Sequence, residues 1–227
     1  MKSINLWIAC LCLLLVNANC KKEDDEPAPS DTGINFGSHD FGSMTDEEGN
    51  TYRTIVIGSA TWMAENLKVT KLNDGTEIPA VPAAQWISRT APAYYDGSAE
   101  FIAIYGRHYN AAASIKACPV GWHLPSSAEW DALVTAVGGM EVAGGKIKET
   151  GIQHWVKPNE AAENSVGFTG LPAGSIHIGA LRDRGSDGYW WTNDQQTFYY
   201  ASASLAQMRT KSTATADNGM TIRCVKD

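Results

Sequence analysis

Cysteine is scarce in this chain, and no apolar run is long enough to span a bilayer. Only five of the 227 residues are cysteine, at positions 10, 12, 20, 118 and 224. The apolar run over residues 6–16 is much shorter than the roughly 20 residues that a transmembrane helix needs. The 18 lysines and arginines are outnumbered by 25 acidic residues, and the resulting net charge of −7 argues against nucleic acid as a partner.

Motifs of the common hydrolases are also missing. The histidines form no HExxH or other paired motif, and no CxxC occurs beyond the N-terminal region. There is no GxSxG elbow for a nucleophilic serine and no glycine-rich phosphate loop. We therefore predict a protein that is not an enzyme and has no cofactor. The five histidines are His39, His108, His123, His154 and His177.

The N-terminus has the features of a secretory leader. Lys2 precedes the apolar run, and the polar stretch NANCKKEDDEP follows it. The pattern resembles a bacterial lipoprotein signal, in which residues 1–19 are removed and Cys20 carries the acyl chains. Asn19 departs from that resemblance, because Gly, Ala or Ser usually precedes the cysteine. The alternative is an ordinary signal peptide that is cut near Ala18.

Residues 20–44 are predicted to form a tether. The stretch KKEDDEPAPSDTG is charged and Pro-containing and has no apolar periodicity, so it is expected to stay solvated. A lysine followed by acidic residues directly after the lipidated cysteine resembles the surface-export signal of Bacteroidota lipoproteins; any hydrophilic spacer is the alternative. The expectation is an exported outer-membrane lipoprotein at the cell surface, with the membrane as a partner through Cys20.

Two cysteines remain outside the leader and the anchor. An exported chain folds in an oxidising compartment, where a remaining pair of cysteines most simply forms a disulfide. A bond between Cys118 and Cys224 would connect the approach to the central helix with the last strand.

The clearest secondary-structure element is a helix that begins after Pro125. Ser126 and Glu129 have the spacing of a capping box, and Pro125 and Trp130 that of a hydrophobic staple. The apolar residues that follow share one helix face and stop before Gly138 and Gly139; they are Trp130, Leu133, Val134 and Val137. Strands are predicted over residues 52–57 and 61–63, a short strand or helix over 101–117, and short strands with long loops from residue 144 onward.

Four blocks, in order, resemble one family. They are DEEGNTYRTIVIGSATWMAENLKVTKLNDGTEIP, YGRHYNAAA, CPVGWHLPSSAEWDAL with VAGGKIKETGIQHW, and NSVGFTGLPAG with YWWTND and TIRCVKD. From about residue 45 to 227 the chain resembles the Fibrobacter succinogenes major paralogous domain. That family in turn resembles the C-type lectin-like fold of formylglycine-generating enzymes. The resemblance implies an α+β domain with a twisted antiparallel sheet, flanking helices and long irregular loops.

The resemblance to C-type lectins also raises the alternative of calcium-dependent sugar binding. Calcium takes about six to eight oxygen ligands from carboxylates, amides and carbonyls. The steps KPNE and WTND are similar to the lectin ligand steps and provide four calcium candidates. In the first step Lys157 stands where an acidic ligand is expected, and in the second step Thr192 interrupts the pattern, so no metal site is favoured. The candidates are Asn159, Glu160, Asn193 and Asp194.

Aromatic residues support two interpretations. Trp62, Trp122, Trp130 and Trp155 belong to the shared blocks and are predicted to be core residues. The cluster over residues 189–200 is expected to place some rings outward, where aromatic side chains suit carbohydrate or protein surfaces. The alternative is a solvated loop over a packed sheet. The ligand-binding candidates are Arg182, Arg184, Tyr189, Trp190, Trp191, Asn193 and Asp194.

The predicted function is non-catalytic binding of a glycan or of another surface protein, for adhesion or nutrient capture. Besides the calcium-dependent lectin, an enzyme distantly related to formylglycine-generating enzymes is a further alternative. Those enzymes need active-site cysteines, and both cysteines of this domain suit a structural bridge.

Overall fold

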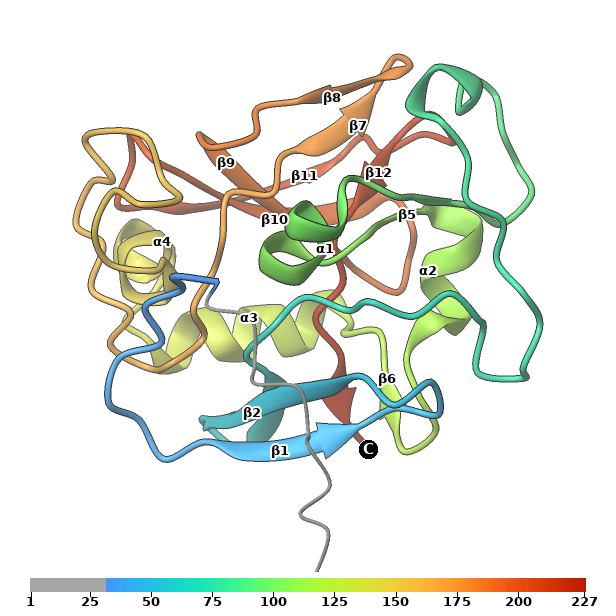
Figure 1. Ribbon diagram of the computed structural model, residues 1–227. Coiled ribbons are helices and arrows are strands. Elements are labelled where there is room, and N and C mark those ends of the chain that lie inside the picture. The colour runs from blue at the N-terminus through green and yellow to red at the C-terminus, as the bar shows by residue number, and fades with distance from the viewer. Residues whose placement is uncertain (1–31) are drawn as a thin grey trace, which may run out of the picture. The chain divides into compact units, whose positions relative to one another are not determined.

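A computed structural model describes residues 32–227, whose elements are arranged as Figure 1 shows. The first and last strands of this region meet in one antiparallel sheet with the order β1-β2-β3-β13-β6. Its strands are β1 (Gly42–Thr45), β2 (Thr51–Ile57), β3 (Ala60–Met63), β6 (Trp122–His123) and β13 (Val225–Lys226). The strands predicted over residues 52–57 and 61–63 are β2 and β3.

Two further antiparallel sheets are formed by the rest of the chain. One has three strands in the order β11-β10-β9, and the other has five in the order β4-β5-β12-β7-β8. The three-stranded sheet consists of β9 (Asp187–Trp191), β10 (Thr197–Ser202) and β11 (Met208–Ser212). The five-stranded sheet consists of β4 (Tyr94–Tyr95), β5 (His108–Asn110), β7 (Ser175–His177), β8 (Ala180–Arg182) and β12 (Gly219–Met220).

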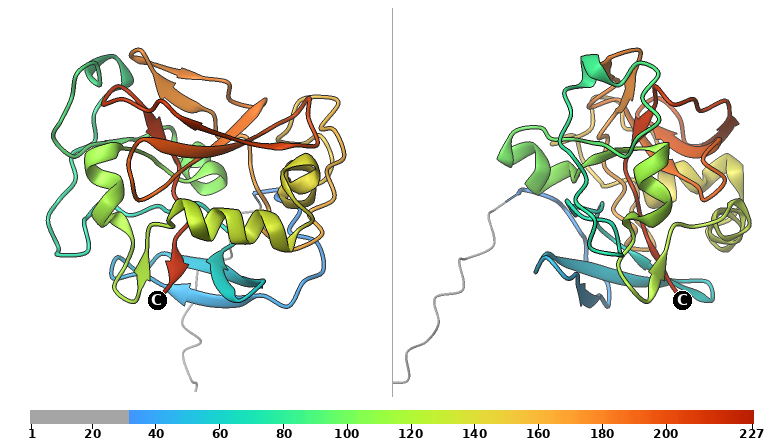
Figure 2. Two further views of the ribbon diagram at one scale, coloured as in Figure 1. Left: turned by 180° about the vertical axis from the view of Figure 1, so that it is seen from behind. Right: turned by 90° about the vertical axis from the view of Figure 1, so that its right-hand side faces the viewer.

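Four α-helices and a 3-10 turn complete the described region. They are η1 (Ala83–Gln85), α1 (Ala99–Tyr105), α2 (Ala111–Ala117), α3 (Ser127–Ala136) and α4 (Met140–Ile147). Figures 1 and 2 show α3 between the β1–β2 side of the molecule and the sheet of β9, β10 and β11. Within residues 32–227, no helix combines the length and the apolar character that crossing a membrane requires.

The predicted helix start is confirmed in α3. The Ser126 side chain accepts a hydrogen bond from the backbone N–H of Glu129, and the Glu129 side chain accepts one from the backbone N–H of Ser126. This reciprocal capping satisfies two backbone donors that a helix N-terminus otherwise leaves free.

Helix α4 was not predicted, because glycine pairs usually end helices. Gly144 and Gly145 lie inside it, at points where the helix touches two other segments. A Cβ atom would lie 2.3 Å from the Gln207 carbonyl oxygen at Gly144 and 2.4 Å from the Ala161 carbonyl oxygen at Gly145. The glycines therefore permit close backbone packing rather than a helix end.

A cluster of rings around α3 forms the larger part of the core. Trp130 packs against Trp62 of β3 at a centroid distance of 4.8 Å and stacks on Tyr199 of β10 at 5.2 Å. The predicted core residues Trp62, Trp130 and Trp155 are buried, and Trp122 is half-buried. Through these contacts Trp130 joins the sheet of β3 to the sheet of β10.

Two cations are fully buried and bind backbone carbonyls instead of carboxylates. The Arg223 guanidinium donates to the carbonyls of Met63, Phe168 and Thr169 at 3.2, 2.7 and 2.9 Å. The Lys148 ammonium donates to three carbonyls at 2.8–3.0 Å, those of Glu160, Ser202 and Leu205. Burial lowers the pKa of Lys148 to about 8. Each cation thus satisfies carbonyls of segments that are distant from one another in the chain.

The predicted disulfide between Cys118 and Cys224 is present. Cys118 ends α2 and Cys224 directly precedes β13, so the bond fixes the last strand to the chain just before β6. Both residues are almost completely buried, at 3% and 0% exposure.

Residues 32–44, which belong to the tether predicted over residues 20–44, contact the rest of the domain. Asn35 donates its backbone N–H to Glu149 at 2.7 Å, the Arg53 guanidinium lies 4.0 Å from the centre of the Phe36 ring, and β1 begins at Gly42. These contacts are polar or single-ring contacts without periodicity, so the sequence pattern did not reveal them. The predicted signal peptide (1–19), Cys20 and the rest of the tether up to residue 31 lie outside the described residues.

The predicted fold class is confirmed as α+β: antiparallel sheets with helices beside them. Long segments without regular structure are also present, above all between α4 and β7. They are held by side-chain hydrogen bonds, such as those of Asn164 to Phe36 and Thr169.

Loss of the disulfide is expected to destabilise the fold. In the chain-entropy model a closed loop of this size is worth up to about 4.7 kcal/mol. The Cys118→Ser/Cys224→Ser variant should unfold at a lower urea concentration than the oxidised wild type. Reductant should lower the wild-type midpoint toward that of the variant and leave the variant unchanged. An oxidised wild type with the same midpoint as the variant would contradict this assignment.

Candidate functional site

The most promising site is a pocket of about 500 Å³ between the β7–β8 hairpin and the outer face of the β9–β10–β11 sheet. Figure 1 shows β7 and β8 beside β9 at the top of the molecule. Of the predicted ligand residues, Arg182 and Tyr189 line this pocket. The other lining residues are Ser175, His177, Ile178, Asp183, Phe198, Lys211, Thr213, Asn218 and Met220.

The rings of Tyr189 and Phe198 line the sheet side of the pocket, and the Tyr200 ring lies directly beside them. Tyr189 pairs with Tyr200 across β9 and β10, so both side chains point to the same face. Their rings are stacked at a centroid distance of 5.4 Å, and the Phe198 ring lies 5.9 Å from that of Tyr189. Tyr189 and Tyr200 are only half-buried, which leaves part of the stacked pair open to a ligand.

Charged groups surround these rings. The Lys211 ammonium of β11 lies 5.6 Å from the centre of the Tyr200 ring. The Tyr189 hydroxyl donates to Asp183 at 3.1 Å. Burial, together with the nearby carboxylates Asp187 and Asp183, holds the pKa of the Tyr189 hydroxyl well above its ordinary value, so this hydroxyl remains a donor.

His177 is oriented by a neighbouring amide. The Asn218 side-chain oxygen accepts from the backbone N–H of Thr215 at 2.8 Å, which leaves its NH₂ group as the donor to His177 Nδ1 at 3.1 Å. A neutral imidazole that accepts at Nδ1 carries its proton on Nε2. His177 therefore offers an N–H donor at an exposed position of the pocket.

The hairpin at the edge of the pocket is strained. Its turn residues, Ile178 and Gly179, have positive φ angles of 46° and 71°. Glycine adopts such angles freely, but a β-branched residue does so at a cost. Ile178 is also 62% exposed, so burial does not explain its presence there. Strain of this kind is common at binding sites.

Trp190 and Trp191, two of the predicted ligand residues, do not form a binding surface. Both are fully buried. The Trp191 indole donates to the Tyr109 carbonyl at 2.7 Å, and the Trp190 indole donates to Asn66 at 3.1 Å. Because both faces of β9 are covered, its aromatic run reads as continuous rather than alternating. Of the three predicted aromatic ligand residues, only Tyr189 is partly exposed, as predicted.

Asn193 and Asp194, also predicted as ligand residues, form the turn between β9 and β10. Asp194 Oδ1 accepts from Thr192 and from the backbone N–H groups of Gln196 and Thr197 at 2.7–2.9 Å. Burial would raise the pKa of Asp194, but these hydrogen bonds outweigh it and lower the pKa to about 2. The carboxylate therefore stabilises the turn.

The four calcium candidates take different places in the fold. Asn159 is buried, and its NH₂ group donates to the carbonyls of Glu149 and Gly151 at 2.9 and 2.7 Å. Glu160 follows it on the exposed side of the loop, while Asn193 and Asp194 belong to the β9–β10 turn. Within residues 32–227, no group of three or more His, Cys, Asp or Glu side chains could hold a metal ion.

Arg184, the remaining predicted ligand residue, lines a second pocket of about 440 Å³. Its guanidinium lies 5.9 Å from the centre of the Phe101 ring of α1. Tyr105 and His154 also line this pocket, with their rings edge to face at 6.0 Å. His154 is held by Glu149 at 2.9 Å and by the Thr32 carbonyl at 3.2 Å. This pocket shares no lining residue with the first one.

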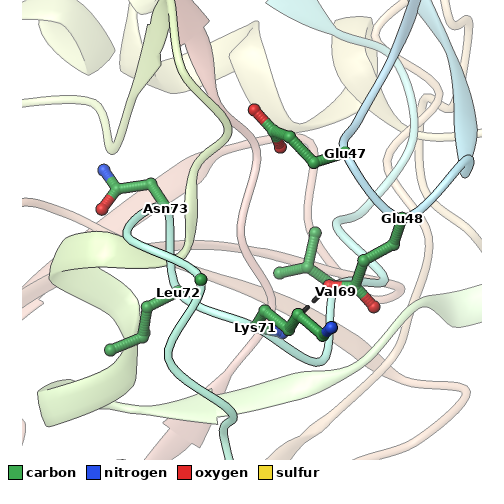
Figure 3. A pocket seen from close by; sticks show the side chains of 7 residues that line it. Glu47, Glu48, Val69, Lys71, Leu72 and Asn73 are labelled. Carbon is green, nitrogen blue, oxygen red and sulfur yellow. Dashed lines mark hydrogen bonds between the residues drawn. The ribbon is translucent and has the colours of Figure 1, made fainter.

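A third hollow, of about 430 Å³, lies between the β1–β2 turn and residues 69–75. Figure 3 shows Glu48 and Lys71 pointing into the same region from these two segments. Glu48 accepts hydrogen bonds from the Thr70 hydroxyl and from the backbone N–H groups of Thr70 and Lys71 at 2.6–2.9 Å. These bonds hold the two segments together, so Glu48 has a structural role.

Several residues of the first pocket were missed from the sequence. Lys211, Thr213 and Asn218 come from β11 and the segment before β12, far along the chain from Arg182. The alternation of β11 indicates that Arg209 and Lys211 share a face, but only the pairing of Tyr200 with Arg209 shows which face that is. The register between strands could not be read from the sequence.

The sequence profile of the Fibrobacter succinogenes major domain matches residues 55–226. The chain belongs to this family. No curated protein and no solved structure matches the chain. The family description names no reaction or ligand, and the matched residues include the whole lining of the first pocket. The function of this member of the Fibrobacter succinogenes major domain family therefore has to be argued from the pocket itself.

The ion pair of His154 and Glu149 predicts a pH dependence of stability. The hydrogen bond that His154 donates to the Glu149 carboxylate raises the pKa of His154 above its ordinary 6.5, and burial offsets only part of this. A raised pKa in the folded state stabilises the protein fully below the ordinary value, and this contribution is lost as the pH rises through the raised pKa. The free-energy difference between wild type and His154→Gln should therefore be largest below about pH 6.5 and fall as the pH rises above that value.

Urea denaturation across this pH range measures the effect. Glu149→Gln removes the other partner and should also abolish the His154-dependent change. A wild type and a His154→Gln variant whose stabilities stay parallel at all pH values would rule out a stabilising ion pair.

Proposed function

We propose that this domain binds a glycan without catalysing a reaction, and that the pocket beneath the β7–β8 hairpin holds the sugar. The stacked pair of Tyr189 and Tyr200 is the observation that carries this proposal. A sugar ring has an apolar C–H face that packs on an aromatic ring, and hydroxyls that need hydrogen-bond partners. His177, Arg182 and Lys211 stand around the rings and can provide those partners.

The chemistry of the described residues supports binding rather than catalysis. Formylglycine-generating enzymes rely on reactive cysteines, whereas Cys118 and Cys224 are joined in a buried disulfide. A cysteine-based nucleophilic mechanism needs a free thiolate. Turnover of a substrate by the purified domain would overturn this part of the proposal.

We also propose the C-type lectin-like fold for this domain. The helix start at Pro125 and Trp130 and the terminal Arg223–Cys224 pair are the residues that carry the resemblance. Their connection through the Cys118–Cys224 disulfide supports the proposal. An experimental structure that superposes poorly on C-type lectin-like domains would contradict it.

Loss of either ring of the aromatic pair is expected to weaken glycan binding. Tyr189→Ala and Tyr200→Ala should each weaken binding about tenfold, because stacking on such rings is worth on the order of 1.4 kcal/mol. The purified domain and its variants can be compared on a glycan array. Tyr105→Ala, which removes a ring from the second pocket, is the matched control and should keep wild-type binding. A signal that survives both tyrosine substitutions would place the site elsewhere.

A lipid anchor at Cys20 and an outer-membrane location at the cell surface are part of the same proposal. The buried disulfide supports export, because such bonds persist in oxidising compartments. Metabolic labelling with palmitate should mark the wild-type protein but not Cys20→Ala. An unlabelled wild type would exclude lipidation and leave an ordinary signal peptide as the explanation of the leader.

A further inference from the structure

Unpaired cations are concentrated around the first pocket. Arg182 and Lys211 line it, and Arg209 points to the same face of β11 as Lys211. All three side chains are exposed, and none of them forms a salt bridge within the described residues. In a chain of net charge −7 this is an unusual place to leave positive charge uncompensated.

Elsewhere on the surface, several cations have acidic partners. Arg53 lies 3.6 Å from Glu65, and Lys71 lies 3.1 Å from Glu77. Similar pairs join Lys116 to Asp74, Arg107 to Asp96 and Lys146 to Glu163. Carboxylates thus pair several cations of this fold, whereas Arg182 and Lys211 have no such partner among the described residues and stay available for an external anion.

The single carboxylate that lines the pocket is already engaged. Asp183 accepts the hydrogen bond of the Tyr189 hydroxyl and so helps to hold that ring in place. Lys211 lies over the face of the Tyr200 ring, so the aromatic pair and the ammonium group form one surface. Arg182 approaches from a different sheet and can donate to the same ligand.

We propose that the ligand of this pocket is an acidic glycan. Its sugar ring packs on Tyr189 and Tyr200, and its carboxylate or sulfate group binds Arg182 and Lys211. A guanidinium and an ammonium group both hydrogen-bond such anions strongly, and the guanidinium does so with two parallel N–H groups. This assignment rests on the proposed function and adds the chemical class of the sugar.

An array that carries neutral, uronate-containing and sulfated glycans tests the assignment. The strongest signals should come from acidic glycans, and whether uronates or sulfates dominate identifies the anionic group. Arg182→Gln/Lys211→Gln should weaken this binding at least about tenfold, since hydrogen bonds to charged groups exceed the energy of one tenfold step. Raising NaCl from about 50 to about 500 mM should weaken wild-type binding as well.

Lys157→Gln/Lys226→Gln is the matched control, because it removes the same two charges from exposed positions outside the pocket. Equal loss in both double variants would mean attraction by overall charge and would overturn the assignment. If neutral glycans bind as well as acidic ones and Arg182→Gln/Lys211→Gln has no effect, the assignment is overturned and the proposed function stays intact. No glycan bound at all would overturn both. The melting temperature of each variant is measured as well, and a value equal to that of the wild type shows that folding is unchanged.

Discussion

The interaction on which the rest of this structure depends is the burial of the Arg223 guanidinium. Taking a charge out of water is costly unless every N–H finds an acceptor. Here the acceptors are three carbonyls and the Asn66 side-chain oxygen, which lies 2.6 Å from Arg223 Nε. The same Asn66 oxygen accepts from the Trp190 indole. Arg223 thus joins Met63 of β3 to residues 168–169 and, through Asn66 and Trp190, to β9. Tyr189, the residue before Trp190 in β9, faces the pocket.

Lys148, the residue directly after α4, has the corresponding role in another part of the core. Its three carbonyl partners are those of Glu160 in the loop after α4, of Ser202 at the end of β10, and of Leu205 between β10 and β11. The buried ammonium thus joins these segments by donating to a carbonyl of each. The long loops of this domain are therefore organised by two central cations, while apolar packing is concentrated around Trp130. Buried cations in the loops and apolar packing around Trp130 together explain how a domain with so little regular structure keeps one conformation.

Features with a local code could be predicted from the sequence, whereas features that depend on pairing could not. Ser126 and Glu129 predict the start of their helix because a capping box acts within four residues. The two cysteines outside the leader and the anchor allow a single pairing. Helix α4 was not predicted because Gly144 and Gly145 are needed for close contact with Gln207 and Ala161, and the sequence alone does not show these contacts between distant residues. The aromatic run of β9 was misjudged for the same reason, because Tyr189 and Trp191 share one face and only the contact of the Trp191 indole with Tyr109 of β5 shows which of the two is covered.

The position of the disulfide has a consequence for the ways in which this domain can be damaged. Cys118 and Cys224 are 106 residues apart, and the whole lining of the first pocket lies between them. A protease that cuts the exposed, strained turn at Ile178 would leave two fragments covalently linked. Such a nicked molecule would migrate as two bands only after reduction, and both halves of the pocket would stay on the same particle.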